Sequence, residues 1–278
     1  MLIISYILIK MVFHWLNKPY TKEYITQVSI VVPVYKEDRE ILYQCLKRCD
    51  KQELVKEILI SIDGDDKESY KTAKKFQRNA SKEVKIFFSR KRLGKRGAQE
   101  VAFKNVSTPI IVTVDSDTLL YPNAIKEIIK PFSVPQIGAV TGLLEVWNKS
   151  DNLLTRILNI RYIVAGALER AFYSYFKVVN CTSGPFSAYR TELVLANLDR
   201  YVRQIHRGKK CTFGDDRHLT NLILKQGYGV FFQKTARAKT IVPNTLKKFL
   251  KQQLRWRIRK AGIQTRVDTH PEAAEEQH

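Results

Sequence analysis

The feature that most constrains this chain is a regular alternation of short β-branched runs with helical runs, which begins after Pro19. Strands are expected over residues 28–34, 57–62, 84–89, 110–114 and 137–141, and helices over residues 38–51, 67–78, 98–105 and 121–130. Strands of about five apolar residues that alternate with helices of about 12 predict parallel pairing in an open, doubly wound α/β sheet. Ligands of such sheets bind at the carboxyl ends of strands, which is where Asp63 and Asp115 fall.

The second half of the chain follows a less regular pattern. We expect a long helical stretch over residues 152–179, helices from residues 191 and 214, two short strands over 229–233 and 238–242, and a last helix over 245–261. One face of the last helix would carry Leu246, Phe249, Leu250, Leu254 and Ile258. Residues 217–267 contain thirteen Lys or Arg and no acidic residue. A basic amphipathic helix of this kind is typical of binding to a membrane surface.

The first sixteen residues are apolar but are interrupted by Lys10 and His14. A bilayer-spanning helix needs about 20 apolar residues. A cleavable signal peptide would carry its positive charge before the apolar run and small residues after it, and this segment has neither. We interpret residues 1–20 as a short membrane-associated segment or interfacial helix. A helix packed against the rest of the molecule is the alternative.

The charge balance indicates which kinds of partner the chain can have. The 48 Lys and Arg exceed the 27 Asp and Glu, so the net charge is +21, which favours nucleic acid, an anionic membrane or phosphorylated substrates. No nucleic-acid-binding module is recognisable, and we expect no nucleic-acid partner. The four cysteines contain no CxxC pair, which argues against a disulfide framework and against structural zinc. The 44% hydrophobic content excludes wholesale disorder.

Two acidic motifs stand where expected strands end. In Asp115-Ser116-Asp117, two carboxylates two residues apart can both reach one hard divalent cation, with waters and a diphosphate completing its coordination. Taken alone, such a motif could consist of solvated loop acids. Asp63-Gly64-Asp65 could be an ordinary turn, or it could form a polar wall for a nucleotide base or ribose.

Three further segments combine charge with helix termini. Residues 90–97 hold five cations, including Lys95, before a helix N-terminus that suits phosphate, although a charge run is often a solvated face. The segment lacks P-loop spacing, which excludes ATP hydrolysis by that route. In Gly214-Asp215-Asp216-Arg217, a carboxylate could cap the helix or act as a general base. In Gln252-Gln253-Leu254-Arg255-Trp256, Trp256 could be a simple interfacial anchor.

In their order along the chain, these motifs resemble those of the processive family 2 glycosyltransferases, most of all the hyaluronan synthases and also the chitin-oligosaccharide and cellulose synthases. The resemblance covers residues 28–258, and its most specific part is the QxxRW motif that ends at Trp256. It implies a GT-A (Rossmann-like) glycosyltransferase domain with a mostly parallel central sheet and C-terminal amphipathic interface helices. It also implies a UDP-sugar donor, and Mn²⁺ or Mg²⁺ as cofactor.

The resemblance also implies a role for each residue that matches a motif. Tyr35, Glu37 and Asp63 would flank the uridine, and Lys95 would approach the nucleotide. Asp117, with Asp115, would hold the metal and diphosphate. The acceptor sugar would be bordered by Ser183, Gly184 and Pro185, and Asp216, beside Asp215, would be the general base. Gln252 and Arg255 would bind the donor diphosphate, and Trp256 would line the site near donor and acceptor.

These expectations divide the chain into the membrane-associated segment, a catalytic domain over residues 21–262 and a polar tail over residues 263–278. Hyaluronan and cellulose synthases follow the QxxRW motif with transmembrane helices, whereas 22 residues (278 − 256) follow Trp256 here. We therefore expect a chain without a channel of its own that lies on the cytoplasmic face of the membrane. A separate membrane subunit is one alternative.

Several functions remain open at this stage. The first is an inverting, metal-dependent transferase that uses UDP-GlcNAc, UDP-GlcA or both on a growing glycan. A chitin-type N-acetylglucosaminyltransferase or another hexosyltransferase is an alternative. A subunit that binds a UDP-sugar without catalysing transfer is another. The sequence does not distinguish these donor sugars.

Overall fold

The computed structural model describes residues 2–206, 209–211 and 214–254. The first half of the chain alternates strands with helices: β1 (Val28–Val34), α2 (Arg39–Asp50), β2 (Val55–Ile62), α3 (Lys67–Gln77), β3 (Glu83–Phe88), α4 (Gly94–Phe103) and β4 (Ile110–Val114). All pairs among these four strands are parallel, in the order β3-β2-β1-β4. The parallel pairing predicted from the sequence is therefore confirmed in this half.

Local side chains explain where the helices of this half begin. The Asp38 carboxylate accepts hydrogen bonds from the N–H groups of Glu40 and Ile41, which makes it the N-cap of α2. Asp66 accepts from the N–H of Ser69 and caps α3 in the same way. These caps satisfy N–H groups that have no partner within their own helix.

The second half is more irregular. Its elements are β5 (Thr118–Leu120), α5 (Ala124–Ile129), a 3₁₀ turn (Lys130–Ser133), β6 (Ile137–Val146), α6 (Leu153–Val164), a π-helical turn (Ala165–Arg170), α7 (Ala171–Tyr175), β7 (Phe186–Arg190), α8 (Thr191–Ala196), α9 (Leu198–Val202), β8 (Ile205–His206), β9 (Lys209–Lys210), α10 (Asp215–Lys225) and β10 (Gly229–Thr240). The strands β8 and β9 form a small hairpin of their own. The other strands extend the main sheet.

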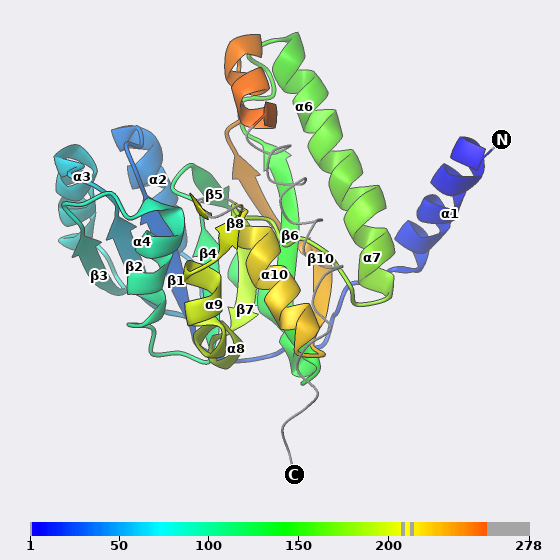
Figure 1. The fold of residues 1–278 in the computed structure, drawn as a ribbon, viewed down its shortest axis with the longest axis horizontal. Coiled ribbons are helices and arrows are strands. Elements are labelled where there is room, and N and C mark those ends of the chain that lie inside the picture. Colours follow the sequence, from blue (N-terminus) through cyan, green and yellow to red (C-terminus); the bar gives the residue numbers. More distant parts are fainter. Residues whose placement is uncertain (1, 207–208, 212–213, 255–278) are drawn as a thin grey trace.

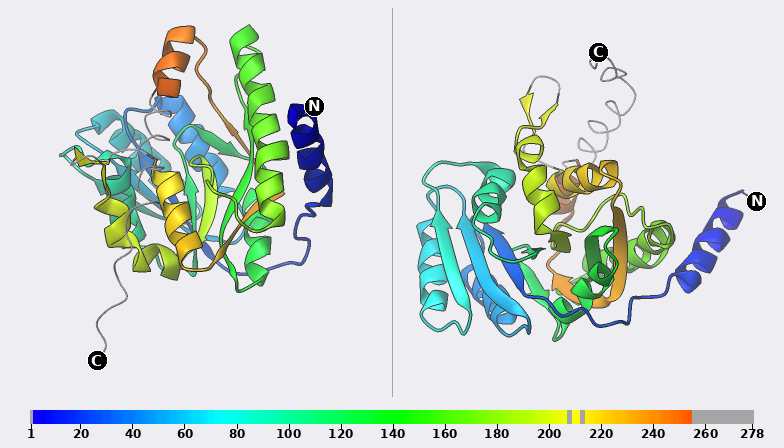
Figure 2. Two further views of the ribbon diagram at one scale, coloured as in Figure 1. Left: turned by 45° about the vertical axis from the view of Figure 1, so that its right-hand side comes forward. Right: turned by 90° about the horizontal axis from the view of Figure 1, so that it is seen from below.

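Within the described residues the main sheet has the order β3-β2-β1-β4-β7-β6-β10-β5, with helices on both faces (Figures 1 and 2). The strand β7 lies antiparallel between β4 and β6, whereas β6 and β10 pair in parallel. The short β5 is antiparallel to the end of β10. The sheet is therefore mixed and mostly parallel, and the chain has an α/β fold.

Several expected elements have other bounds in the structure, among them the helix expected over 98–105, which begins at Gly94, and the strand expected over 137–141, which extends to Val146. The two strands expected over 229–233 and 238–242 are the single strand β10, whose register against β6 shifts between Gln233 and Arg237. A shift of this kind bends a long strand without ending it. The helical stretch expected over 152–179 contains the π-helical turn and ends at Tyr175. The helix expected from Tyr121 begins at Ala124.

Alternate residues of the central strands pack into two separate hydrophobic cores, one on each face of the sheet. Val28, Ile30 and Val32 of β1 pack with α2, α3 and α5 on one face of the sheet. Val31 points to the opposite face and packs with Phe103 of α4 and with helices α8 to α10. Burial on both faces explains why these strands are continuously apolar in sequence.

The N-terminal helix α1 (Leu2–Leu16) contacts the π-helical turn and α7 at one side of the molecule (Figure 1). The Phe13 ring lies against the rings of Phe172, Tyr175 and Phe176, and the buried Lys10 ammonium pairs with Glu169. Helix α1 is therefore packed on the domain through one face, as in the alternative given above. No helix among the described residues is long and apolar enough to cross a membrane.

The last helix is described over residues 246–254. Phe249 packs against a small cluster formed by Val146, Leu158 and Val242, which attaches this helix to β6 and α6. Arg161 Nη1 of α6 donates to Gln253 Oε1 at 3.0 Å. The remainder of the expected helix and the tail over 263–278 lie outside the described residues.

Candidate active site

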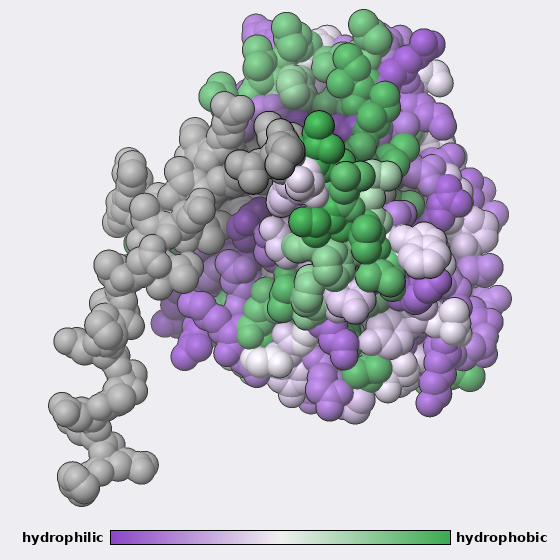
Figure 3. All heavy atoms as spheres, turned by 90° about the vertical axis from the view of Figure 1, so that its right-hand side faces the viewer, coloured by the Kyte–Doolittle hydropathy of each residue, from purple (hydrophilic) through white to green (hydrophobic). Residues whose placement is uncertain are grey.

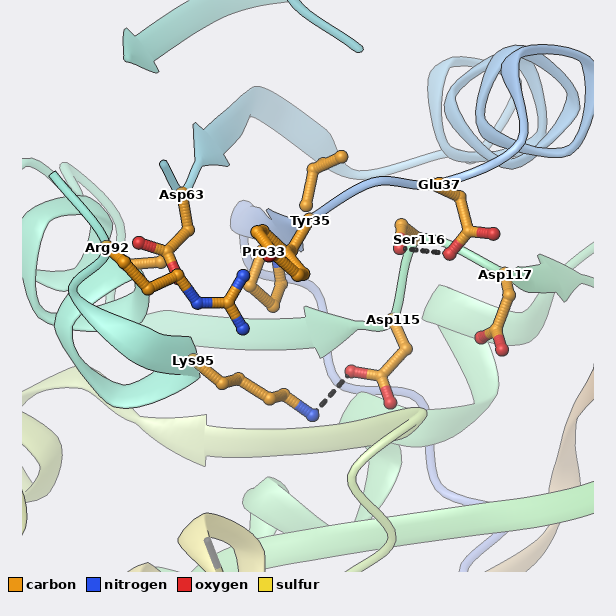
Figure 4. Close-up of a pocket in the computed structure, with 11 residues that line it drawn as sticks. Pro33, Tyr35, Glu37, Asp63, Arg92, Lys95, Asp115, Ser116 and Asp117 are labelled. Carbon is orange, nitrogen blue, oxygen red and sulfur yellow. Dashed lines mark hydrogen bonds and ion pairs between the residues drawn. The ribbon is translucent and has the colours of Figure 1, made fainter. Parts of the chain in front are cut away.

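A pocket opens at the carboxyl ends of β1, β2 and β4, the edge of the sheet at which the sequence predicts a ligand (Figure 4). Its lining consists of Pro33, Val34, Tyr35, Glu37, Asp63, Arg92, Lys95, Ala98, Asp115, Ser116 and Asp117. Of these, Tyr35, Glu37, Asp63, Lys95, Asp115 and Asp117 are predicted site residues. The structure therefore gathers the residues predicted for the donor and the metal around one cavity.

Asp63 organises the basic loop that follows β3. Its carboxylate, almost fully buried, accepts hydrogen bonds from the N–H groups of Leu93 at 2.6 Å and Gly94 at 2.9 Å. It also pairs with Arg92 Nε at 3.1 Å. The αL conformation of Gly94, with φ of +77°, suits glycine at this turn into α4. Asp63 therefore fixes the loop that borders the pocket, and its place beside a nucleotide stays a prediction.

Arg92 is a pocket residue that sequence reasoning did not single out. Its guanidinium carbon lies 3.0 Å from the centroid of the Tyr35 ring, and both side chains face the cavity (Figure 4). Such stacking of a guanidinium on an aromatic ring is favourable and fixes both groups. The only sequence signal for Arg92 is its membership of the basic run before α4, which does not distinguish it from its neighbours.

Lys95 connects the two halves of the site. Its ammonium lies 2.6 Å from Asp115 Oδ1, at the end of β4, and 3.3 Å from Asp215 Oδ2, at the start of α10. Burial disfavours the charged amine, but Asp115, Asp215 and Asp216 outweigh it and raise the pKa of Lys95 well above its usual range. The ammonium is therefore held charged between carboxylates from distant parts of the chain.

Asp117 lies in a buried environment in which neighbouring negative charge outweighs the positive charge of Lys95. Ser116 Oγ donates to Glu37 Oε2 at 2.8 Å, which keeps the Glu37 carboxylate near the acidic motif. Burial first, and then the charges of Asp115 and Glu37, raise the pKa of Asp117 to about 7. Carboxylates crowded in this way are stabilised by a divalent cation, and their oxygens are the hard ligands that Mg²⁺ and Mn²⁺ accept.

This donor set fits a metal that has further ligands. Among the described residues, no group of three or more His, Cys, Asp or Glu is arranged to hold a metal ion. A cation held by Asp115 and Asp117 would therefore take its remaining oxygens from waters and from a bound diphosphate, as Mg²⁺ commonly does.

The loop of Ser183, Gly184 and Pro185 reaches the same place from the other side. A Cβ atom at Gly184 would lie 3.4 Å from Lys95 Nζ, 3.6 Å from Asp216 Oδ2 and 3.8 Å from Asp115 Oδ2. Gly184 therefore lies directly beside these three groups. The structure brings together the predicted acceptor loop, the predicted base and the acidic motif.

The two acidic residues at the start of α10 have different surroundings. The N-cap position of the helix is Gly214, which is in the αL conformation. Asp215 is buried and pairs with Lys95, whereas Asp216 is half-buried and its Oδ1 accepts from the N–H of Arg217. Asp216 thus satisfies one N–H of the first turn of α10, as the capping alternative expects, and its role as general base stays a prediction.

The QxxRW segment is described only in part. Gln252 is half-buried in the last helix. Arg255 and Trp256 lie outside the described residues, and their expected places at the diphosphate and acceptor stay predictions.

Comparisons with known proteins agree with the fold and with the family that the sequence resembles. The family model described as "Glycosyltransferase like family 2" matches residues 26–258. The chain is 38% identical to a hyaluronan synthase of Streptococcus pyogenes over 261 residues, which is 92% of this chain and 62% of that protein. It is 35% identical to an N-acetylglucosaminyltransferase of Sinorhizobium fredii over 231 residues, 82% of this chain and 56% of that protein.

Two solved structures share the fold at low sequence identity. A mannosyltransferase from Pyrobaculum calidifontis in complex with GDP-Man and Mn²⁺ has a TM-score of 0.66 at 16% identity, covering 97% of this chain and 74% of that one. GalNAc-T7 with UDP, GalNAc and Mn²⁺ has a TM-score of 0.56 at 14% identity, covering 78% of this chain and 43% of that one. These likenesses establish the fold. The chain spans 62% of the length of the hyaluronan synthases that it matches.

Proposed function

Because this chain belongs to the family 2 glycosyltransferases and has the GT-A fold, we propose that it is an inverting, metal-dependent enzyme that transfers a sugar from a UDP-sugar to a growing glycan. One observation carries the proposal. Asp115, Lys95 and Asp216, which come from three separate parts of the chain, converge beside Gly184. Asp115 and Lys95 also line the pocket proposed for the donor.

The pocket supplies the groups that a nucleotide diphosphate requires. Tyr35, Glu37 and Asp63 would flank the uridine, and Arg92 adds a cation on the Tyr35 ring. The Lys95 ammonium, together with Gln252 and Arg255, would face the diphosphate, and Trp256 would complete the wall between donor and acceptor. Cations placed where a leaving group gains negative charge stabilise the transition state.

The acceptor hydroxyl would lie beside Ser183, Gly184 and Pro185, with Asp216 as the general base and Asp215 fixed behind it by Lys95. As the hydroxyl oxygen bonds to the anomeric carbon, the bond from that carbon to the diphosphate oxygen breaks and its electron pair stays with UDP. The hydroxyl proton passes to the Asp216 carboxylate. A single displacement inverts the anomeric centre and gives a β-linkage from an α-linked donor.

Asp117 and Asp115 would hold Mn²⁺ or Mg²⁺, which when bound supplies Lewis-acid neutralisation of the diphosphate. The proposal for this cofactor is supported by the crowded carboxylates and by the Mn²⁺ in the two structures of similar fold. Residues 21–262 would form the catalytic domain.

We propose UDP-GlcNAc, UDP-GlcA or both as donors, because of the similarity to a hyaluronan synthase and to an N-acetylglucosaminyltransferase. The experiment is to measure UDP release by the purified chain in Mn²⁺ or Mg²⁺, with each sugar nucleotide alone and with both together. Release that requires both supports a hyaluronan-type polymerase, and steady release with UDP-GlcNAc alone supports a chitin-type enzyme. Binding of UDP without release from any UDP-sugar would contradict transferase activity and favour a binding subunit.

We further propose that the chain docks on an anionic membrane at the cytoplasmic face, either directly or beside a membrane subunit. Apolar side chains gather on one side of the molecule, over the region of α1 and α6 (Figure 3). The exposed ones on α1, α6 and the last helix include Ile4, Leu8, Trp15, Leu153, Ile157, Ile160, Leu246, Leu250 and Leu254. Lys247, Lys248 and Lys251 accompany them, and this combination suits an anionic lipid surface.

Vesicle flotation tests the docking proposal. The full chain should bind vesicles containing anionic lipid, and Ile160→Glu or Leu250→Glu should weaken binding, because each places a charge on the apolar face. Leu195→Glu is the matched control, since Leu195 is exposed on α8 at the other end of the fold. Equal binding by all four proteins would contradict docking through this face.

A further inference from the structure

Three buried hydroxyl groups connect the loop at Gly184 to the first turn of α10. Thr182, Tyr189 and Thr220 are 0%, 2% and 0% exposed. Thr182 directly precedes the Ser183-Gly184-Pro185 loop, and Tyr189 lies on β7, which follows that loop. Thr220 lies one helical turn after Asp216 on α10. These residues lie behind the reacting groups and do not line the pocket.

The hydrogen bonds of this group have a single consistent direction. The Thr220 hydroxyl donates its hydrogen to the main-chain oxygen of Asp216 at 2.7 Å. It therefore accepts from the Thr182 N–H at 3.0 Å and from the Thr182 hydroxyl at 2.9 Å. The Thr182 hydroxyl in turn accepts from the Tyr189 hydroxyl at 2.8 Å. Each hydroxyl supplies one hydrogen, so every donor in this run is satisfied.

The same loop is fixed on its other side to the sheet. The Ser183 N–H donates to Thr141 Oγ1 of β6 at 2.9 Å, and the Ser183 carbonyl accepts from Ser187 Oγ of β7 at 2.6 Å. The Pro185 carbonyl accepts from the N–H of Asp115 at 3.3 Å. The loop is thus held against β4, β6 and β7, and the Thr182–Thr220 pair adds the connection to α10.

We propose that Thr182 and Thr220 are positioning residues, which set the distance between the proposed base Asp216 and the acceptor position at Gly184. The inference deepens the proposed function and rests on it. A base must lie within hydrogen-bond reach of the proton it removes, and a displacement of about 1 Å can cost about 10²-fold in rate. The Thr220 hydroxyl contacts both the main chain of Asp216 and the residue that begins the acceptor loop.

The test compares Thr220→Val, Thr220→Ser and Thr72→Val in the full chain. Valine keeps the shape of threonine but removes the hydroxyl that joins loop and helix, whereas serine keeps the hydroxyl. Thr72 is the matched control, because it is also buried and donates to the carbonyl four residues earlier, Glu68, at 3.1 Å in α3. UDP release, UDP affinity and thermal unfolding are measured for each variant.

We expect Thr220→Val to lower kcat for transfer about tenfold or more, because it leaves buried N–H and O–H groups without their partner. UDP affinity should stay within about twofold, since the donor pocket is elsewhere, and Thr220→Ser should recover kcat to within about threefold. Thr72→Val should match the wild type in kcat. A Thr220→Val protein with unchanged kcat, or one that loses kcat and UDP affinity in parallel, would overturn the proposal.

A second variant and a hydrogen-exchange measurement distinguish a failure of this proposal from a failure to fold and from a failure of the proposed function. If Thr220→Val does not fold, Tyr189→Phe is tested in its place. We expect this variant to lose kcat about two- to fivefold at unchanged UDP affinity. An unchanged kcat would overturn the proposal. Amide hydrogen exchange at residues 182–184 and in the first turn of α10 should be faster in Thr220→Val than in Thr72→Val. Should the wild type release no UDP, the proposed function fails, and the exchange rates alone decide whether Thr220 holds this loop.

Discussion

The two halves of this molecule are built differently, and their contributions to the site differ accordingly. Residues 28–114 form four parallel strands with regular helical connections, and the pocket lies at the ends of those strands. Residues 118–240 form a mixed arrangement in which β7 enters antiparallel between β4 and β6. The regular half supplies most of the pocket proposed for the donor, and the irregular half carries the loop and helix proposed to hold the acceptor and the base.

If the two halves have these separate roles, substitutions in each half should change different measured properties. Changes to pocket residues on the side of the parallel strands should affect donor and metal binding together with transfer, whereas changes away from the pocket should affect stability alone. Changes on the side of the loop and α10 should affect transfer alone. The four predictions below test this difference in order of decreasing effect on activity.

Asp117→Asn should have the largest effect. Loss of one carboxylate of the proposed metal pair should lower UDP release about 10³-fold, corresponding to about 4 kcal/mol of lost charge stabilisation. The measurement is UDP release as a function of Mn²⁺ concentration, in which the variant should also need more metal. Asp65→Asn, at an exposed position in the segment that follows β2, is the control. Turnover of Asp117→Asn near that of the control would rule out the metal assignment.

Asp216→Asn should lower transfer about 10²-fold or more, because an amide cannot take the acceptor proton. UDP affinity, measured by calorimetry, should not change, which distinguishes this variant from Asp117→Asn. Asp199→Asn provides the control, since Asp199 is exposed on α9. A parallel loss of UDP affinity and transfer would contradict the proposal that the first half binds the donor and that α10 acts in transfer alone.

Asp63→Asn should weaken UDP binding about tenfold and destabilise the fold by about 1–3 kcal/mol, because buried N–H groups lose a charged acceptor. Asp50→Asn is a matched control, because the Asp50 carboxylate also accepts from two main-chain N–H groups, those of Ser81 and Lys82, away from the pocket. Calorimetry with UDP and urea unfolding should show a stability loss in both variants but an affinity loss only in Asp63→Asn. Unchanged UDP affinity in Asp63→Asn would contradict its place in the donor site.

Glu57→Gln should change stability but not activity per folded molecule. Glu57 is fully buried and accepts from Ser29 Oγ at 2.5 Å, the Ser107 N–H at 2.8 Å and Lys85 Nζ at 2.6 Å. Although burial opposes its charge, these bonds lower the pKa of Glu57 from 4.5 to about 2. The carboxylate therefore stabilises the fold above pH 4.5, by about 3 kcal/mol, and this contribution is lost as the pH falls toward 2.

The measurement for Glu57 is urea unfolding at several pH values from 7 down to 3. Glu57→Gln should be less stable than the wild type at pH 7, and the difference should shrink as the pH falls below 4.5. Glu53→Gln, at an exposed position, should behave like the wild type. A difference that stays constant across this pH range would contradict the assigned pKa.

The regular half was predictable from sequence, and the irregular half only in part. The strand at 28–34 is continuously apolar, and Asp38 and Asp66 mark the starts of helices, so local signals agree with the fold there. The strand β7 reads FSAYR, a short run without apolar alternation that was not predicted. Its position is set by pairing with Ile110–Val114 and Ala139–Thr141, which lie far away in the sequence.

The site, like the fold, could be predicted from the sequence only in part. The strand-end rule located Asp63 and Asp115, while Asp216 and Gly184 were connected to them only through the family resemblance. The contacts of Lys95 with Asp115 and Asp215 join residues that are 20 and 120 positions apart (115 − 95 and 215 − 95), and no spacing rule spans such distances. The Thr182–Thr220 pair left no signal, because single hydroxyl residues are common throughout the chain.

The pairing of β5 with β10 has a consequence for how the molecule is made. The strand β5 begins directly after Asp117, and it pairs with residues 238–240, where Thr240 Oγ1 lies 3.5 Å from Asp117 Oδ1. Contacts between segments so far apart form late in folding. During synthesis we expect the parallel strands to assemble first, while Asp117 stays unsupported until residue 240 has left the ribosome. The part of the pocket formed at the ends of β1, β2 and β4 would then be in place before the acidic motif is fixed against β10.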